Sequence, residues 1–372
     1  MRPIHLYVHV PFCVRRCSYC DFAIAVRRRV PVDEFLDAIA RELAYRHPGG
    51  ESWPVETLYL GGGTPSLLGA DGVARLLDVI RRRVTLAASA EVTLEANPDD
   101  VTSGAARAWR GAGVNRLSIG AQSFDDGVLA WMHRTHAAHQ VARAVAAARE
   151  ADIVNLSLDL IFALPGSLRR DWDRDLEAAL ELAPAHLSLY GLTVEPGTPL
   201  GKWRERGTVA DTPDDVYEAE FLRAHERLGA MGYEHYEVSN YALSGRQSRH
   251  NSAYWCGSAY DGIGPAAHGY DGERRRWNVA AYSEWCGRLV AGSDPEAGSE
   301  VLSEGQRMAE RLYLGLRTCA GVAVTVGAEE RIARWVQAGW AVVELGTVRL
   351  TPLGWLRLDA LAADLTPYGS LY

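Results

Sequence analysis

The sequence predicts an α/β protein built on a partial barrel of six βα units, a (βα)6 arrangement, with a small winged-helix-like domain at the C-terminal end. Two observations indicate this fold. Short β-rich segments alternate with segments of helical periodicity through the first half of the 372 residues. Polar or glycine-rich motifs also recur where the strands end, which is the end of such a barrel that carries the chemistry.

Six segments are typical of strands because they are rich in β-branched, aromatic and aliphatic residues. They span 4–10, 55–62, 90–97, 115–123, 154–164 and 186–192. Helical periodicity marks four segments between them, at 32–46, 71–84, 139–150 and 171–182. Because repeated βα units imply parallel strands, we expect all six strands to end at one mouth of the barrel.

We expect three parts along the chain: the core barrel at 1–240, a loop-rich connecting segment at 241–300, and a C-terminal domain at 301–372. Glycines punctuate the middle part, which should wrap an edge or the mouth of the barrel. The last part reads as a helix, a second helix, two short strands about Gly346 and a final helix. Charges of both signs along 329–337 favour a docking or lid role over DNA binding.

Charge and hydropathy narrow the class of protein. The formal net charge of -8 argues against a nucleic-acid partner, because phosphate binding relies on a basic footprint. The longest strongly apolar stretch, 154–166, is shorter than the ~20 residues that cross a bilayer, and no charged-then-apolar leader precedes Cys13. We expect a cytoplasmic protein that is not an integral membrane protein.

Three of the six cysteines, Cys13, Cys17 and Cys20, fall within eight positions. A structural zinc site usually has four ligands, but the other three cysteines lie singly and far apart. A disulfide framework is typical of short secreted chains. The spacing therefore favours a 4Fe-4S cluster with one open iron, and zinc or plain structural cysteines remain the alternatives.

Further polar residues stand at the predicted strand ends. Gly61, Gly62 and Gly63 follow the second strand, where backbone groups without side chains can approach a small ligand closely. Glu95, Gln122 and Asp159 are candidates to hydrogen-bond the sugar and amino-acid parts of a nucleoside ligand. The alternative for each is structural: a tight turn for the glycines and a strand-end cap for the others.

The Cys-x3-Cys-x2-Cys loop followed by "GGGTP" resembles the radical S-adenosylmethionine (SAM) superfamily. The resemblance implies that the three cysteines hold a 4Fe-4S cluster, that SAM occupies its fourth iron, and that an electron from the cluster cleaves SAM. Motifs from residue 7 to 255 are similar, in order, to the HemN/HemW group. By position, the resemblance implies SAM-pocket roles for Tyr7, Tyr19, Gly62, Gly63, Thr64, Glu95, Gln122, Arg134, Asp159 and Thr193.

Within that group the chain resembles the HemW branch, whose members are haem chaperones. The oxygen-independent coproporphyrinogen III dehydrogenases show Cys-x3-Cys-x2-Cys-x-Cys and a longer N-terminal segment, whereas here Asp21 and Phe22 follow Cys20. The stretch "HNSAYW" matches the pattern His-Asn-x-x-Tyr-Trp. The resemblance suggests His250 as an axial haem ligand, with Tyr254 and Trp255 stacking on the porphyrin.

Two other residues of this region, His268 and Cys256, are close enough in sequence to replace His250 as the ligand. An ordinary hydrogen-bonded role for His250 is the structural alternative. We expect a haem chaperone that carries haem to acceptor proteins, membrane-bound ones among the possibilities, and takes electrons from a donor. The alternatives are a radical enzyme acting on coproporphyrinogen III or methylating a small molecule, and a purely structural iron-sulfur protein.

Overall fold

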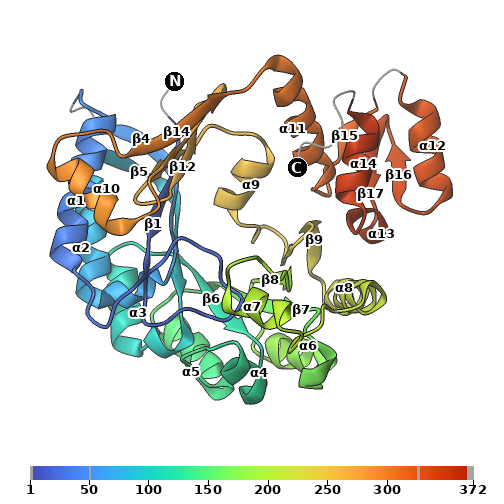
Figure 1. The fold of residues 1–372 in the computed structure, drawn as a ribbon, viewed down its shortest axis with the longest axis horizontal. Coiled ribbons are helices and arrows are strands. Elements are labelled where there is room, and N and C mark those ends of the chain that lie inside the picture. The colour runs from blue at the N-terminus through green and yellow to red at the C-terminus, as the bar shows by residue number, and fades with distance from the viewer. Residues whose placement is uncertain (1–2, 50–51, 325–326, 367–372) are drawn as a thin grey trace.

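A curved nine-stranded sheet organises the chain (Figure 1). The computed structural model describes residues 3–49, 52–324 and 327–366. The strand order is β11-β1-β4-β5-β6-β7-β8-β10-β9, in which the strands from β11 to β8 are parallel and β10 and β9 are antiparallel. The predicted α/β partial barrel is confirmed. The parallel strands are β1 (His5–Val10), β4 (Trp53–Gly62), β5 (Val84–Ala96), β6 (Arg116–Gln122), β7 (Asn155–Phe162), β8 (His186–Gly191) and β11 (Asp261–Ile263).

Helices cover the outer face of this sheet (Figure 1). The four predicted helices are confirmed as α1, α2, α5 and α6, but α3, α4, α7 and α8 were not predicted. Helices α3 and α4 are short, and α3 contains two glycines; its start depends on the Thr102 side chain, which accepts a hydrogen bond from Ala105 N–H. The helices are α1 (Val32–Arg46), α2 (Gly69–Arg81), α3 (Ser103–Gly111), α4 (Asp126–Trp131), α5 (Ala138–Glu150), α6 (Trp172–Glu181), α7 (Pro199–Glu205) and α8 (Asp214–Ala230).

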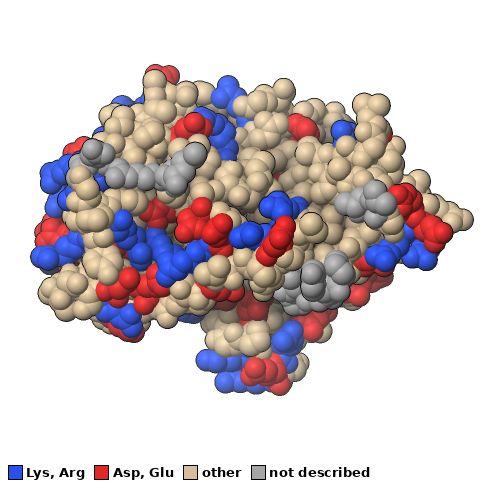
Figure 2. Space-filling view, turned by 90° about the horizontal axis from the view of Figure 1, so that it is seen from above, with Lys and Arg blue, Asp and Glu red and all other residues tan. Residues whose placement is uncertain are grey.

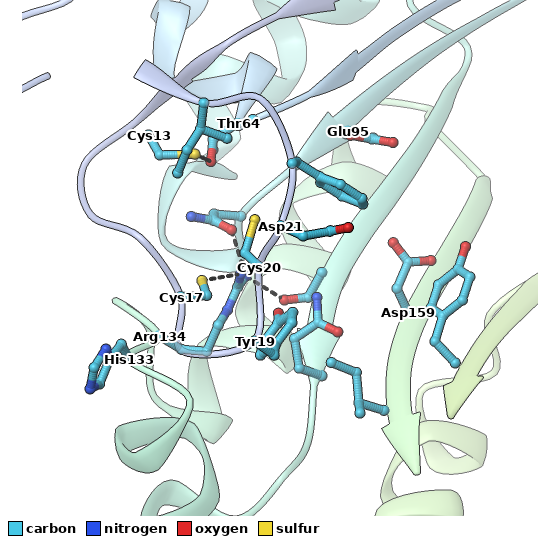
Figure 3. A pocket seen from close by; sticks show the side chains of 18 of the residues that line it. Cys13, Cys17, Tyr19, Cys20, Asp21, Thr64, Glu95, His133, Arg134 and Asp159 are labelled. Atoms are coloured by element: carbon cyan, nitrogen blue, oxygen red, sulfur yellow. Dashed lines mark hydrogen bonds between the residues drawn. The ribbon is translucent and has the colours of Figure 1, made fainter. Parts of the chain in front are cut away.

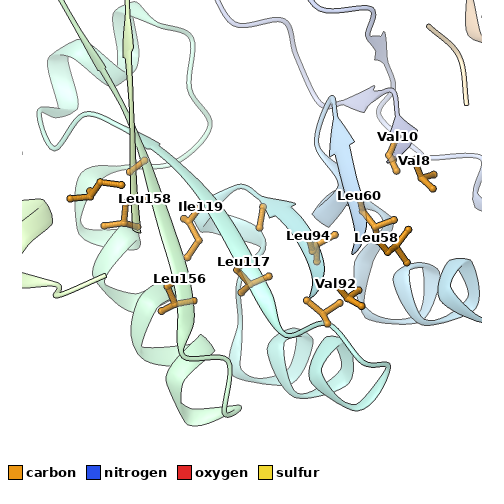
Figure 4. Packing of buried hydrophobic residues seen from close by; sticks show 14 of the residues in the cluster. Val8, Val10, Leu58, Leu60, Val92, Leu94, Leu117, Ile119, Leu156 and Leu158 are labelled. Carbon is orange, nitrogen blue, oxygen red and sulfur yellow. The ribbon is translucent and has the colours of Figure 1, made fainter. Parts of the chain in front are cut away.

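Side chains alternate between the two faces of the parallel strands, because successive residues of a strand point to opposite sides. The outward members are aliphatic and pack under the helices (Figure 4). They include Val8, Val10, Leu58, Leu60, Val92, Leu94, Leu117, Ile119, Leu156 and Leu158. The intervening residues are polar or aromatic and face the barrel interior, so the same alternation that builds the core also supplies the groups of the site.

The connecting segment 241–300 carries more regular structure than its glycine-rich sequence predicts. It contains α9 (Arg249–Trp255), β12 (His268–Tyr270), β13 (Arg274–Asn278), α10 (Tyr282–Val290) and β14 (Glu296–Val301), and its β11 pairs with β1. The expected boundary at 240 falls inside β10 (Asn240–Ala242), which follows β9 (Glu234–Glu237). Buried Glu42 of α1 accepts hydrogen bonds from Asn278 at 2.7 Å and Trp285 at 2.9 Å. These bonds attach the segment to the barrel.

The C-terminal part contains the predicted helices and the two strands about Gly346 in order, and adds a two-residue strand, β15, and a short helix, α13, that were not predicted. It comprises α11 (Glu304–Leu316), β15 (Val322–Ala323), α12 (Glu329–Gln337), β16 (Ala341–Glu344), β17 (Thr347–Leu350), α13 (Pro352–Trp355) and α14 (Leu358–Leu365). Its three strands form an antiparallel sheet in the order β15-β17-β16. Among the described residues, no helix has the length and apolar character needed to span a bilayer.

Candidate functional site

A cavity of about 420 Å³ lies at the carboxyl ends of the parallel strands (Figure 3). The loop after β1 forms one wall, and the ends of β4 to β8 form the other. Nine of the residues predicted for a SAM pocket line this cavity together with the three cysteines. These are Tyr19, Gly62, Gly63, Thr64, Glu95, Gln122, Arg134, Asp159 and Thr193, with Cys13, Cys17 and Cys20.

The cysteine loop is held by local pairing. Two-residue strands β2 (Phe12–Cys13) and β3 (Ala25–Val26) pair in parallel and close the loop that contains Cys17 and Cys20. All three thiols are free and face the cavity (Figure 3). In the described part of the chain, no three His, Cys, Asp or Glu side chains converge on one metal ion. A four-iron cube does not require such convergence, because each thiolate binds a different iron; the soft, three-thiol donor set therefore fits a cluster.

The Arg134 guanidinium lies beside the second cysteine. Its Nη1 donates to Cys17 Sγ at 3.6 Å, and its Nη2 donates to Asn97 Oδ1 at 2.6 Å and to the Gly120 carbonyl at 2.8 Å. Its Nε is buried without a partner, and none of the carboxylates that the structure describes forms an ion pair with it. A partly buried cation without a protein counter-ion favours an anionic ligand at this point of the cavity.

Glu95 connects the glycine turn to the barrel floor. Its carboxylate accepts hydrogen bonds from the Gly62 N–H at 3.0 Å and from the Tyr59 hydroxyl at 2.8 Å. Burial and the nearby Asp159 carboxyl together raise the pKa of Glu95 to about 7, although the hydrogen bonds from Tyr59 and Gly62 lower it. Gly62 has φ +114°, and a Cβ there would lie 2.6 Å from the His9 ring, so the turn requires glycine.

Asp159 lies across the cavity from this turn (Figure 3). The Ser118 hydroxyl donates to it at 3.0 Å, and the Ser157 hydroxyl at 3.3 Å. Burial raises the pKa of Asp159, whereas the serine hydrogen bonds lower it. Glu95 and Asp159 therefore place two buried carboxyl groups at the strand ends, and Arg134 places a guanidinium beside the cysteines, a distribution that suits a zwitterionic ligand with sugar hydroxyls.

Tyr7 and Gln122, both predicted for the SAM pocket, differ in their position relative to the cavity. Tyr7 does not line the cavity; it lies beneath it, where its hydroxyl is 3.1 Å from His9 Nδ1 and its ring is 6.1 Å from that of Tyr59. Gln122 does line the cavity and has φ +66°, a strained conformation for a residue other than glycine. Such strain is often concentrated at functional sites.

Sequence reasoning missed several lining residues. Asn97 and Tyr190 stand at the ends of β5 and β8, in the position that identified Glu95 and Gln122, so the strand-end rule could have found them. Ser118 faces inward by the strand alternation. His133 comes from a loop and carried no comparable signal.

The structure places the His-Asn-x-x-Tyr-Trp motif on α9, inside the concave side of the sheet (Figure 1). His250 is 1% exposed. Its Nδ1 lies 2.7 Å from Thr57 Oγ1, and its Nε2 lies 2.8 Å from the Tyr254 hydroxyl. Burial lowers the pKa of His250 to about 3. Both ring nitrogens of His250 have hydrogen-bonding partners, as expected for an ordinary hydrogen-bonded histidine and not for a haem ligand.

The other candidate haem-binding residues differ in how far their side chains are exposed to solvent. Trp255 is partly buried, and the Arg317 guanidinium lies 4.3 Å from its ring centroid. Cys256 is exposed at the end of α9. His268 on β12 is also exposed, with its ring 6.0 Å from that of Trp277. The structure thus leaves Cys256 and His268 more accessible than His250.

Sequence comparisons agree with the geometry of the cavity. The model of the radical SAM superfamily matches residues 7–179. The heme chaperone HemW of Mycobacterium tuberculosis is 38% identical over 334 residues, covering 89% of this chain and 86% of that protein. The heme chaperone HemW of Escherichia coli is 40% identical over 268 residues, covering 72% and 70%.

One solved structure shares the whole fold. Coproporphyrinogen III oxidase (HemN) from Escherichia coli superposes with a TM-score of 0.83 at 21% identity, covering 99% of this chain and 91% of that one. At this identity the similarity extends to the fold alone.

Proposed function

This chain belongs to the HemW family of the radical SAM superfamily, and from that premise we propose that it is a haem chaperone that binds a 4Fe-4S cluster, SAM and haem and transfers haem to an acceptor protein. The single observation that carries the proposal is the cavity in which three free thiols, a glycine turn and an unpaired guanidinium face one another. Its volume suits a ligand of the size of SAM.

In this proposal Cys13, Cys17 and Cys20 hold the cluster. When bound, the cluster supplies single electrons for the cleavage of SAM. The protein positions the thiols: the Thr64 hydroxyl lies 3.4 Å from Cys13 Sγ, and Arg134 donates to Cys17 Sγ. Positive charge and hydroxyl contacts stabilise thiolate sulfur, which is the form that binds iron.

The SAM-binding groups act as acceptors and donors around the rest of the cavity. The carboxylates of Glu95 and Asp159 suit the ammonium group and ribose hydroxyls of SAM, and Arg134 suits its carboxylate. Tyr59 and Ser118 hold the two acids in place. Gly62 and Gly63 let the turn pack closely on the strand beside it, since a Cβ would lie 2.6 Å from the His9 ring at Gly62 and 2.7 Å from the Pro11 carbonyl at Gly63.

For haem we propose Cys256 or His268 as the iron ligand in place of His250, with Tyr254 and Trp255 as packing groups. The preference for His250 rested on its motif, but it is a buried histidine whose ring nitrogens are both hydrogen-bonded. To reach haem it would have to break both contacts and leave the barrel. Cys256 and His268 are exposed and need no such rearrangement.

The partners follow from the same function. We propose a haem-accepting protein and an electron donor for the cluster as partners, and a cytoplasmic location. Lysine and arginine side chains lie among aspartate and glutamate side chains on the face seen in Figure 2. This mixture of charges supports a surface without a nucleic-acid footprint on that face.

The residues after the third cysteine support a chaperone over an oxidase. Asp21 and Phe22 follow Cys20, where the dehydrogenase pattern Cys-x-Cys has a fourth cysteine.

Haem titration tests the ligand assignment. Anaerobically reconstituted protein should bind haem with a Soret band that shifts in Cys256→Ala or in His268→Ala. No saturable haem binding by the wild type would contradict the chaperone proposal. An unchanged band in both variants would remove these two ligands only.

A further inference from the structure

Arg317, the residue that ends α11, joins the C-terminal part of the chain to the barrel. Its carbonyl accepts a hydrogen bond from the Val238 N–H at 3.2 Å. The next residue, Thr318, forms an antiparallel bridge with Glu237 of β9. This backbone pairing fixes the point from which the Arg317 side chain extends.

A buried carboxylate and an indole ring orient the Arg317 guanidinium. Its Nε lies 2.8 Å from Glu237 Oε2, and the Glu237 side chain is 0% exposed. The guanidinium carbon lies 4.3 Å from the centroid of the Trp255 ring. Trp255 belongs to α9, which Figure 1 shows between the strands of the barrel and α11. Because Nε faces a carboxylate and one face of the group lies on a ring, the guanidinium is held in one orientation.

The pair of Arg317 and Trp255 has donor groups that no protein atom uses. Arg317 Nη2 has one partner, Ser239 Oγ at 3.3 Å, and Nη1 has none among the described residues. The Trp255 Nε1–H is buried, and within the described part of the chain nothing accepts a hydrogen bond from it. A buried indole N–H usually has an acceptor. Unused donors on two adjacent side chains, one of them charged, favour a carboxylate as the ligand.

Two other arginines lie over tryptophan rings, and their donors are used differently. Arg170 lies over Trp172, whose indole N–H donates to the Glu220 carbonyl at 2.9 Å. Arg357 lies over Trp340, and both of its Nη atoms donate to oxygen atoms of the protein. Of these three pairs, the pair at α9 is the one that leaves a donor unused on both members.

We propose that Arg317 and the Trp255 indole N–H bind a propionate of haem, while the ring of Trp255 packs on the porphyrin. This inference rests on the proposed function, because it requires haem as the cargo. Cys256, a candidate iron ligand, directly follows Trp255, so the carboxylate site borders the proposed haem site. A guanidinium has five N–H donors, so Arg317 can bridge Glu237 and a propionate at the same time.

Haem and its dimethyl ester test the carboxylate directly, because the ester keeps the iron and the ring but has no negative propionates. We expect the wild type to bind haem about tenfold more tightly than the ester in titrations followed by the Soret band. Arg317→Leu/Glu237→Gln removes both charges of the ion pair, so no buried charge is left unpaired. The variant should bind haem as weakly as it binds the ester. A purely steric penalty of the ester would persist in the variant.

Two further variants separate ligand binding from stability. Arg357→Leu is the matched control, at an arginine that also lies over a tryptophan, and it should keep the preference for haem over the ester. Trp255→Phe keeps an aromatic ring and removes the N–H. Because no described residue accepts from that N–H, this variant should keep its unfolding temperature and lose about threefold of the preference.

Metal-free protoporphyrin IX has the same propionates as haem, so its affinity should depend on Arg317 whichever residue binds the iron. Equal affinity of the wild type for haem and the ester would overturn the inference and leave the proposed function standing. An unchanged preference in whichever of Arg317→Leu/Glu237→Gln and Trp255→Phe folds would also overturn it. No saturable haem binding by the wild type would contradict the proposed function, and this inference with it.

Discussion

The ring of His250 stacks on the ring of Tyr59, with centroids 5.1 Å apart and an interplanar angle of 28°. Tyr59 in turn donates to Glu95, which lines the cavity. The helix of the His-Asn-x-x-Tyr-Trp motif is therefore in contact with the floor of the proposed SAM pocket, although His250 itself lies outside the cavity.

This contact predicts that His250→Ala weakens SAM binding, by about tenfold, because Tyr59 and Glu95 lose their support. The haem Soret band should remain. Calorimetric titration with SAM and haem absorption measure the two effects, and His268→Ala is the matched control, with SAM affinity retained. Loss of the Soret band in His250→Ala with normal SAM affinity would instead make the buried histidine the haem ligand.

Each cysteine of the loop should be required for the cluster. Removing one thiolate leaves two protein ligands for a cube that needs three in addition to SAM, so Cys17→Ala should lose bound iron and sulfide after anaerobic reconstitution. Cys319→Ala, at a cysteine far from the cavity, should retain both. Full iron and sulfide content in Cys17→Ala would refute the ligand assignment.

Gly62→Val should abolish SAM binding. The variant combines a positive φ with a Cβ placed 2.6 Å from the His9 ring. Backbone strain of this kind costs roughly 1–3 kcal/mol. Gly69→Val is the matched control, because Gly69 has φ +73° but nothing within 4 Å of its Cβ position. If both variants unfold at similar temperatures and only Gly62→Val loses SAM, displacement of the glycine turn by the clash with His9 explains the loss.

A conservative substitution near the glycine turn should leave SAM binding unchanged. Leu68→Met, a few residues beyond the glycine turn, should bind SAM as the wild type does, because the two side chains have similar volumes. Wild-type SAM affinity in Gly62→Val would show that the pocket lies elsewhere.

SAM affinity should depend on pH through Glu95, whose pKa is raised to about 7. Below that pH the carboxyl is protonated and loses its attraction for the cationic groups of SAM, so affinity should fall as pH decreases through about 7. For the ligand-free fold the sign is opposite: a raised carboxyl pKa contributes stability at low pH that is lost as pH rises from the unfolded value toward 7.

Two groups influence Glu95: the Tyr59 hydroxyl on the neighbouring strand β4 and the Asp159 carboxyl on β7, two strands away. The pKa of Asp159 is also raised. Glu95→Gln should flatten the pH dependence of SAM binding measured by titration between about pH 6 and 8. Asp99→Asn, at an exposed acid after β5, should preserve it. An unchanged pH dependence in Glu95→Gln would assign it to another group.

The parallel core was predictable because its signals are local. Alternating aliphatic residues such as Leu58 and Leu60 identify a strand, and the strand-end rule predicts site roles for Gly62 and Glu95, which are hydrogen-bonded to each other. Helix α3 was missed because its formation depends on packing more than on its glycine-containing sequence.

Long-range contacts were not predictable. The pairing of β11 with β1 joins residues more than 250 positions apart, and nothing local in either segment specifies it. The burial of His250 depends on Thr57 and Tyr254 meeting it inside the barrel. A motif gives residue types, whereas access to a ligand depends on the packing around them.

The central claim, that the chain carries haem and does not oxidise a porphyrinogen, is tested most directly in one anaerobic sample. Reconstituted protein with SAM and reductant is given haem and coproporphyrinogen III, and the Soret band and the porphyrinogen products are measured together. We predict a saturable Soret band and no loss of coproporphyrinogen. Conversion to protoporphyrinogen would contradict the account.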